Sequence, residues 1–241
     1  MNIAVVFAGG VGKRMHSKDK PKQFLELSNK PIIIHTLEHF ELHELIDSIV
    51  VVCVQDWIPH MQNLVYKYRV DKVKSIVAGG ETGQLSIYNG LLEAEKIAHG
   101  EDSIVLIHDG VRPLINSEII TRNIKCVEKH GNAITSGIVK ETIVEIDDDS
   151  SVVSVPDREH SRVAKAPQSF RLADILNAHR KALSEGKKTF IDSCTMMKYY
   201  GAQLFMVDGP YENIKITTPD DFYTVRAILQ VKEDQQIYGL E

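Results

Sequence analysis

The chain has 241 residues, a length that allows one full hydrophobic core in a single α/β domain. Its formal net charge of −5 argues against a nucleic-acid partner, because binding to a phosphate backbone requires a basic face. No apolar run approaches the roughly 20 residues of a membrane helix, and the first residues do not form a secretory signal, so we expect a cytoplasmic protein with no membrane partner. Cys53, Cys126 and Cys194 lie too far apart for CxxC pairs, which favours free thiols over a disulfide or zinc framework.

A glycine-rich loop follows the first predicted strand. Residues 3–7 form an apolar run typical of a buried parallel strand, and they lead into AGGVGKRM at 8–15 and PKQF at 21–24. Glycine lets backbone N–H groups approach phosphate oxygens, and Arg14 and Lys22 can neutralise phosphate charge. The loop matches neither the P-loop nor the dinucleotide-binding fingerprint, and a plain strand-to-helix connection is the alternative. The two cations favour a phosphate site.

The next part of the chain alternates between predicted helices and strands. We expect helices at 31–40, 57–68, 86–98 and 117–129, the last with Ser117 as its N-cap, and strands at 46–54, 75–78 and 104–107. This alternation predicts a doubly wound, mostly parallel sheet, in which ligands bind at the carboxyl ends of the strands. The glycine loop, the Gly79-Gly80 turn and residues 108–113 all follow strands, so we expect them to converge on one site.

Residues 138–166 depart from this alternation. Residues 139–146, a turn at 147–150 and residues 152–155 resemble a hairpin more than a strand–helix unit. A hairpin alone is marginally stable, so we expect a dimer-forming arm that packs on a partner subunit; a hairpin folded back on its own domain is the alternative. No linker, repeat or low-complexity tract divides the sequence, which predicts a single domain over 1–241.

The last third returns to helices and strands. We expect a helix at 172–183, a short helix capped by Asp192, a strand at 204–207, and a final helix at 222–231 that starts from Thr218 or Asp220.

Nine short segments make the chain similar to a known family over nearly its whole length. They are AGGVGKRM at 8–15, PKQF at 21–24, GG at 79–80, Ser86 with NGL at 89–91, HDGVRP at 108–113, VKET at 139–142, DR at 157–158, APQSF at 166–170 and NIKITTPDD at 213–221. In this order and spacing they resemble the cytidylyltransferases that join CMP to a polyol phosphate. One branch of that family belongs to isoprenoid synthesis and acts on 2-C-methyl-D-erythritol 4-phosphate; another belongs to wall and capsule synthesis and acts on D-ribitol 5-phosphate.

This resemblance implies a nucleotidyltransferase (Rossmann-like) fold, a homodimer, CTP and a polyol phosphate as substrates, and Mg²⁺ as cofactor. The implied reaction is an in-line attack of the acceptor phosphate on the α-phosphorus of CTP, with release of pyrophosphate. Catalysis would then depend on positioning and on cations, with no protein nucleophile.

The resemblance also assigns roles to charged residues. Arg14, Lys22 and Lys215 would hold the phosphates of CTP and stabilise the transition state. Asp109 would orient the ribose or support Mg²⁺, indirectly through the phosphates, and Arg112 would hold the phosphate of the acceptor. Solvated surface positions are the alternative for the cations, and a simple turn after a strand is the alternative for Asp109.

Nucleotide and acceptor contacts follow from the same resemblance. Recognition of CTP would use Ala8, Gly9, Gly10, Gly12, Gly80 and Ser86, mostly through backbone groups that exclude a purine by shape. Thr142 and Arg158 match positions that reach the partner subunit's acceptor, so each active site would be composite.

Three positions differ from the methylerythritol-phosphate branch. Ala166 and Ile191 replace threonines, and Gly83-Gln84 stands where an arginine usually follows the Gly-Gly turn. The loss of two hydroxyl contacts favours an acceptor other than 2-C-methyl-D-erythritol 4-phosphate. Residues 109–112 and 191–194 look closer to the ribitol-phosphate branch, so we expect D-ribitol 5-phosphate as acceptor, with 2-C-methyl-D-erythritol 4-phosphate as the alternative. Because Ala166 departs from the ribitol branch as well, a glycerol phosphate stays open. More remote alternatives are a sugar-phosphate nucleotidyltransferase that uses UTP or GTP and a catalytically silent nucleotide-binding protein.

Overall fold

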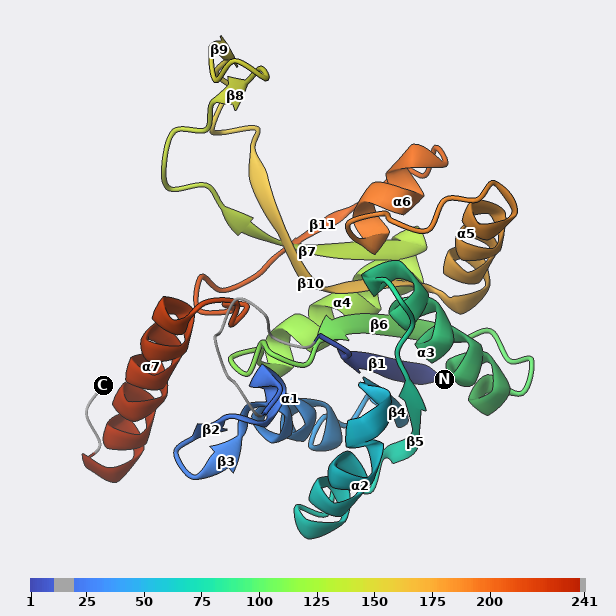
Figure 1. Ribbon diagram of the computed structural model, residues 1–241, viewed down its shortest axis with the longest axis vertical. Helices are drawn as coiled ribbons and strands as arrows, with labels where there is room; N and C mark the ends of the chain where they lie inside the picture. The colour runs from blue at the N-terminus through green and yellow to red at the C-terminus, as the bar shows by residue number, and fades with distance from the viewer. Residues whose placement is uncertain (11–19, 239–241) are drawn as a thin grey trace.

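Seven strands form the central sheet of the described part of the chain, which comprises residues 1–10 and 20–238 of a computed structural model (Figure 1). Their order across the sheet is β11-β7-β10-β6-β1-β4-β5. The bounds are β1 Asn2–Ala8, β4 Ser48–Cys53, β5 Val73–Ala78, β6 Ile104–Asp109, β7 Asn132–Ile138, β10 Arg162–Arg171 and β11 Met206–Asp208.

The sheet is mostly parallel, as predicted. Strand β1 pairs in parallel with β4 and β6, β4 with β5, and β7 with β11, whereas β10 runs antiparallel to both β6 and β7. Strands β7 and β10 were not predicted from the sequence. Strand β10 is antiparallel because the chain leaves the carboxyl edge of the sheet after β7, forms the arm, and returns through the same edge.

Helices cover both faces of the sheet (Figure 1). Helices α1 (Ile32–Glu41), α2 (Ile58–Lys67) and α4 (Ser117–His130) contribute to one hydrophobic cluster, and α3 (Gly83–Ala98), α5 (Leu172–Ser184) and α6 (Ser193–Tyr199) contribute to the other. Alternate residues of a strand point into opposite clusters: Val6 of β1 belongs to the first and Val5 to the second. Burial on both faces explains why β1 and β4 are continuous apolar runs.

Helix α4 has a different cap from the one expected, and α3 starts earlier than expected. Helix α4 is capped by the side chain of Asn116, which accepts a hydrogen bond from the backbone N–H of Ile119 at 3.0 Å, so the assignment of Ser117 as N-cap was wrong by one residue. Helix α3 begins three residues earlier than expected because Thr82 caps it, accepting from the N–H of Leu85 at 3.2 Å. The predicted cap of α6 is confirmed, since Asp192 accepts from the N–H of Thr195 at 2.8 Å.

Helix α3 lies very close to the sheet at Gly90. A Cβ on Gly90 would lie 2.6 Å from Cγ1 of Val5 and 2.7 Å from Cγ2 of Val52. Glycine is therefore required there by packing. Gly83, at the start of the same helix, has open space around the corresponding position.

A third cluster joins the last helix to the body of the domain. Helix α7 (Pro219–Tyr238) packs through Val225 on Leu27 and Ile32, and Ile216 lies in the same cluster. Leu27 belongs to a small hairpin of β2 (Glu26–Leu27) and β3 (Lys30–Pro31), which follows the 3-10 turns of Lys22–Phe24. A second 3-10 element, Gln55–Trp57, precedes α2.

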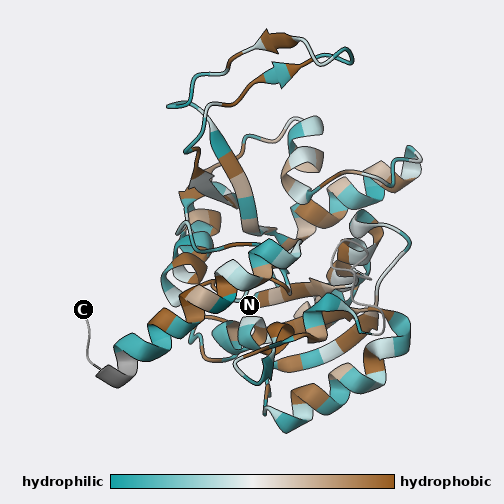
Figure 2. Ribbon diagram, turned by 60° about the vertical axis from the view of Figure 1, so that its left-hand side comes forward, coloured by the Kyte–Doolittle hydropathy of each residue, from teal (hydrophilic) through white to brown (hydrophobic). Residues whose placement is uncertain are grey.

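The predicted hairpin projects from the carboxyl edge of the sheet (Figure 1). It consists of β8 (Glu145–Ile146) and β9 (Val152–Ser154), paired antiparallel, and it does not fold back on its own domain. Hydrophobic residues on it are visible in Figure 2. The exposed ones in and around the arm are Ile138, Ile143, Val144, Ile146, Val152, Val153, Val155 and Val163.

Two negative expectations concern cysteines and membranes. Cys53, Cys126 and Cys194 are all free, as expected. Within the described residues, the structure has no helix with the length and apolar character needed to cross a bilayer.

Candidate active site

The carboxyl ends of β1, β4, β5 and β6 meet at one edge of the sheet, and the loops that follow them are in contact. The N–H of Gly110, after β6, donates to the carbonyl of Phe7 in β1 at 3.0 Å. The N–H of Gly79, after β5, donates to the carbonyl of Cys53 at the end of β4 at 2.8 Å. The expected convergence of these loops is therefore confirmed for the part of the glycine loop that the structure describes.

Ser86 connects the glycine loop to the Gly-Gly turn. Its Oγ accepts a hydrogen bond from the N–H of Gly80 at 3.0 Å and donates to the carbonyl of Thr82 at 2.9 Å. A Cβ on Gly79 would lie 3.0 Å from this oxygen, and one on Gly9 would lie 3.5 Å from it. The approach at Gly79 leaves little room for a side chain, whereas a Cβ on Gly9 would make an ordinary contact with Ser86.

The end of β1 is fixed by a residue to which the sequence analysis gave no role. Gln23 is buried, and its Nε2 donates to the carbonyl of Ala8 at 2.5 Å. Lys22, next to it in the chain, donates from Nζ to the carbonyl of Ile216 at 2.8 Å. The PKQF segment thus joins the end of β1 to the segment that carries Lys215.

A buried carboxylate with two cations lies at the end of β6. Asp109 Oδ2 is 2.7 Å from Nε of Arg112, and its Oδ1 is 2.5 Å from Nζ of Lys215. The side chains of Asp109 and Arg112 are almost fully buried, whereas that of Lys215 is 41% exposed. Lys215 can therefore present its charge to a ligand while Asp109 holds its position.

Electrostatics fix the charge state of this cluster. Burial alone would raise the pKa of Asp109, but the charges of Arg112 and Lys215 and their hydrogen bonds outweigh it and lower the pKa to about 2. Burial lowers the pKa of the adjacent His108 to about 3, so this histidine is neutral at pH 7. At neutral pH the cluster is one carboxylate between two cations, with a net positive charge.

Long-range hydrogen bonds bring Lys215 to the cluster. Arg112 donates from Nη1 to the carbonyl of Asn213 at 2.9 Å, and the side-chain amide of Asn213 donates to the carbonyl of Ala166 at 2.7 Å. The N–H of Ile216 donates to the carbonyl of Val111 at 2.9 Å. Residues 109–112, 166 and 213–216 are thereby joined by hydrogen bonds into one unit.

A pocket of about 320 Å³ opens beside this unit. Asp109, Arg112 and Lys215 line it, together with residues of β10, α3 and the start of α6. Ala166 and Ile191, the two positions where threonines are missing, also line it. A wider and more open hollow of about 760 Å³ between α2 and β5 contains none of the predicted site residues.

Two further polar residues in the pocket had no predicted role in the site. Gln168 donates from Nε2 to Asp192 Oδ2 at 2.9 Å and accepts from the N–H of Cys194 at 2.8 Å, so it fixes α6 against β10. Lys165 lines the same pocket. The segment APQSF was noted in the sequence, but nothing in it shows that β10 passes beside Asp109; only the unpredicted antiparallel pairing of β10 with β6 does so.

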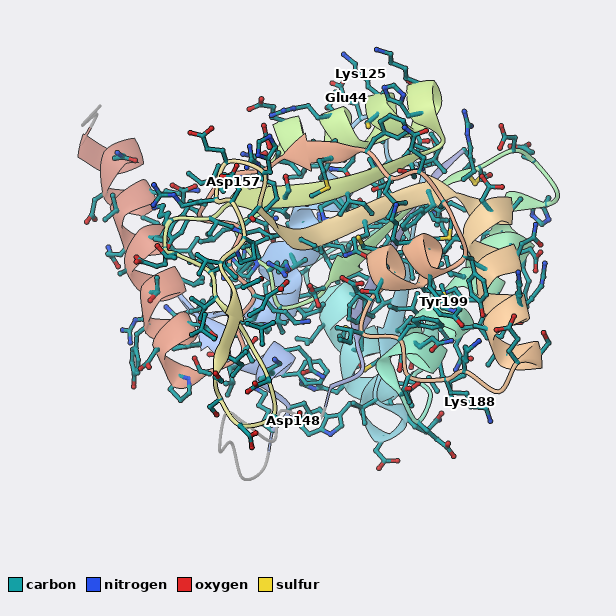
Figure 3. All side chains as sticks on the ribbon, turned by 90° about the horizontal axis from the view of Figure 1, so that it is seen from above. Glu44, Lys125, Asp148, Asp157, Lys188 and Tyr199 are labelled. Carbon is teal, nitrogen blue, oxygen red and sulfur yellow. The ribbon has the colours of Figure 1, made fainter. Side chains whose placement is uncertain are left out.

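The remaining predicted residues lie elsewhere. Thr142 and Arg158 are exposed on the arm and do not line the pocket of their own chain; Arg158 donates to the carbonyl of Lys140 at 3.3 Å. Gly10 has no neighbour near the position of a Cβ. Arg14 and Gly12 lie outside the described residues. Figure 3 shows other charged side chains, such as Glu44, Lys125 and Lys188, at the rim of the domain.

Comparison with known proteins gives concordant results. Residues 2–231 match the family model IspD, described as 2-C-methyl-D-erythritol 4-phosphate cytidylyltransferase. The chain is 57% identical over 240 residues to a ribitol-5-phosphate cytidylyltransferase of Streptococcus agalactiae, with 100% of both chains covered. It is 38% identical to a 2-C-methyl-D-erythritol 4-phosphate cytidylyltransferase of Clostridium botulinum, over 95% of this chain and 97% of that protein. The crystal structure of 4-diphosphocytidyl-2C-methyl-D-erythritol synthase from Anaerococcus prevotii superposes with a TM-score of 0.82 at 29% identity, covering 95% of this chain and 96% of the other.

Proposed function

We infer that the chain, which belongs to the 2-C-methyl-D-erythritol 4-phosphate cytidylyltransferase family, is a CTP-dependent cytidylyltransferase whose acceptor is D-ribitol 5-phosphate. It transfers CMP to the acceptor phosphate and releases pyrophosphate. The observation that carries the activity is the Asp109–Arg112–Lys215 cluster, which lies at the same sheet edge as the Gly80–Ser86 turn. The choice of acceptor is supported by relatives that match over nearly the full length. The sequence identity is higher with relatives named for ribitol 5-phosphate than with those named for methylerythritol phosphate.

CTP binds at the turn in this proposal. Backbone groups of residues 8–10 and of Gly80 read the cytosine, and Ser86 holds the turn in the shape that this reading requires. A pocket formed by closely approaching backbones excludes a purine by size, and unpaired polar groups penalise uracil. Gly12, outside the described residues, is assigned to the same loop.

Cations then act on the phosphates. Lys22 and Lys215 hold the triphosphate and stabilise the charge that develops on the α-phosphate during in-line attack, with Arg14 of the loop in the same role. Arg112 binds the acceptor phosphate. Asp109 contributes by fixing Arg112 and Lys215, so that the two cations need no reorganisation when charge develops.

Mg²⁺ fits this site only with help from the nucleotide. Among the described residues no group of three or more His, Cys, Asp or Glu side chains could hold a metal ion, and both oxygens of Asp109 already contact cations. Bound to the phosphates of CTP, Mg²⁺ would supply charge neutralisation, and Asp109 would reach it at most indirectly.

We propose that the enzyme works as a homodimer with composite active sites. The arm carries exposed apolar residues together with Thr142 and Arg158, which do not reach the pocket of their own chain. An arm that packs on the partner subunit would bury the apolar residues and would place Thr142 and Arg158 at the acceptor bound by the partner. The substrates are small charged solutes, so we place the enzyme in the cytoplasm, without nucleic-acid or membrane partners, in wall- or capsule-polymer synthesis.

The test is pyrophosphate release with CTP and Mg²⁺ against D-ribitol 5-phosphate, 2-C-methyl-D-erythritol 4-phosphate and glycerol phosphates, side by side. We expect the highest kcat/KM with D-ribitol 5-phosphate, and loss of activity when UTP or GTP replaces CTP. Preference for methylerythritol phosphate would move the protein to isoprenoid synthesis. Absence of turnover with every acceptor would contradict the proposed activity.

A further inference from the structure

Lys165 is a pocket residue with no role in the reaction as described above. It lies on β10, directly after Ala164, the last paired residue of the outer segment of that strand, where the pairing with β7 shifts its register. Its aliphatic part packs against β7: a Cβ on Gly137 would lie 2.8 Å from Cε of Lys165. The side chain is half-buried and lines the same pocket as Arg112.

The ammonium group of Lys165 has no carboxylate partner among the described residues. Its hydrogen bonds go to backbone carbonyls, at 3.1 Å to Tyr211 and at 3.4 Å to Pro210. A second cation lies nearby, because Lys140 and Lys165 share the ring of Tyr211: their Nζ atoms lie 3.5 Å and 5.6 Å from its centroid. Burial and the charge of Arg112 both lower the pKa of Lys165, while Glu212 opposes this effect.

Two cations in one small pocket favour an anionic ligand. Asp109 compensates only part of the positive charge, since it is shared between Arg112 and Lys215. A guanidinium has five N–H donors, and Arg112 uses Nε for Asp109 and Nη1 for Asn213, which leaves donors for a further acceptor. A phosphate monoester carries a charge of roughly −1.5 to −2 at neutral pH and has three acceptor oxygens, which suits two convergent cations.

We propose that Lys165 is an acceptor-binding residue whose ammonium group binds the phosphate of the polyol phosphate together with Arg112. This inference rests on the proposed cytidylyltransferase function and adds to it a contact supplied by the chain's own β10. It also gives a physical reason why Ala166 and Ile191 can lack hydroxyl groups: the charge of the acceptor phosphate, more than its polyol hydroxyls, would hold it in this pocket.

A purely structural role is the competing explanation. The bonds from Lys165 to the carbonyls of residues 210 and 211 tie β10 to the segment that leads to Lys215. If that were the whole role of Lys165, its removal would disturb Lys215 and would therefore affect CTP and the acceptor alike. A ligand contact predicts an effect on the acceptor alone.

The experiment compares Lys165→Met and Lys165→Arg with the control Lys72→Met in the steady-state assay. Lys72 is a matched control because its Nζ also donates to a backbone carbonyl, that of His43 at 2.7 Å, and it does not line the pocket. For Lys165→Met we expect the KM for D-ribitol 5-phosphate to rise about 10- to 100-fold, the range of a charged hydrogen bond, with the KM for CTP changed less than about 2-fold. Lys165→Arg should restore most of the loss, and Lys72→Met should behave as wild type.

Inhibition by unphosphorylated ribitol separates phosphate binding from polyol binding. Its inhibition constant should be the same in wild type and Lys165→Met. A large increase in that constant would show that Lys165 binds the polyol, and would overturn the assignment to the phosphate. An unchanged acceptor KM, or equal losses for CTP and acceptor with a lowered unfolding temperature, would overturn it as well. If wild-type enzyme uses no polyol phosphate, the proposed function itself fails and this inference falls with it; activity of the wild type therefore distinguishes the two failures.

Discussion

Replacement of Asp109 by asparagine tests whether the buried cluster stabilises the fold as the structure indicates. Asparagine keeps the size of the side chain but removes its charge, so Arg112 and Lys215 would face each other without a carboxylate between them. Both cations lose a charged hydrogen bond, and Arg112 stays buried. We therefore expect a loss of folding stability together with a loss of kcat.

The size of the stability loss follows from the pKa of Asp109. At about 1.4 kcal/mol per pKa unit, a lowering from 3.8 to about 2 corresponds to about 2 kcal/mol in favour of the charged form in the folded state. Repulsion between the remaining cations adds to this value, but Lys215 is 41% exposed and can turn toward solvent. We expect Asp109→Asn to lower the free energy of unfolding by about 2–3 kcal/mol at pH 7.

The stability difference between wild type and Asp109→Asn should depend on pH. Because folding lowers this pKa, the stabilisation is complete above 3.8, the pKa of a free aspartate, and it disappears as the pH falls toward about 2. In urea unfolding followed by circular dichroism, the free energies of unfolding of wild type and Asp109→Asn should thus differ by the same amount at pH 7 and pH 5. The difference should be smaller near pH 3. The control is Asp102→Asn, because Asp102 pairs with Arg171 at 3.0 Å but its side chain is 75% exposed. This substitution should lower the free energy of unfolding by less than about 1 kcal/mol. Equal losses in the two variants, or a difference already gone at pH 5, would refute the reasoning.

Three further predictions concern packing, nucleotide binding and assembly. Gly90→Ala should lower the free energy of unfolding by about 1–3 kcal/mol despite its better helix propensity, because the added methyl would overlap two valine side chains of the sheet; Gly83→Ala, with open space, should be neutral or slightly stabilising in the same urea titration. Ser86→Ala should raise the KM for CTP about 10-fold while leaving the acceptor KM unchanged, since the N–H of Gly80 loses its partner; an unchanged KM for CTP would remove Ser86 from the nucleotide site. Replacement of 139–158 by a short loop should give a monomer with little activity. A variant that is monomeric by light scattering and still active would exclude composite sites.

The loops proposed to bind the nucleotide could be placed from sequence because short motifs and strand patterns mark them. Ser86 lies six residues after Gly80, and the strand that precedes each loop is recognisable from its apolar run. Parallel alternation then places all these loops at one edge, as the topology shows. In the part of the chain that the structure describes, Gly9, Gly80 and Ser86 lie at this edge; that they bind CTP stays a prediction.

The acceptor side could not be predicted in the same way. Strand β10 is only partly apolar and contains a proline and a register shift, so its sequence lacks a strand pattern. Its antiparallel entry beside β6 depends on the arm, and it is this entry that places Lys165 and Gln168 in the pocket. The error at the cap of α4 has a smaller cause: Asn116 and Ser117 are both good capping residues, and only the backbone decides between them.

Specificity for the acceptor can vary at pocket residues that take no part in the bond between Gly80 and Ser86. Bonds between distant segments hold both regions: Thr82 and Gln84 donate to the carbonyls of Lys188 and Lys187, and Arg112 donates to that of Asn213 across 101 positions. Substitutions at Ala166 or Ile191 change the wall of the pocket without touching the turn. Relatives of this chain are named for two different polyol phosphates. Under the proposed function, the acceptor can change through side chains of β10 and the start of α6 while Gly80, Ser86 and the Asp109 cluster stay constant.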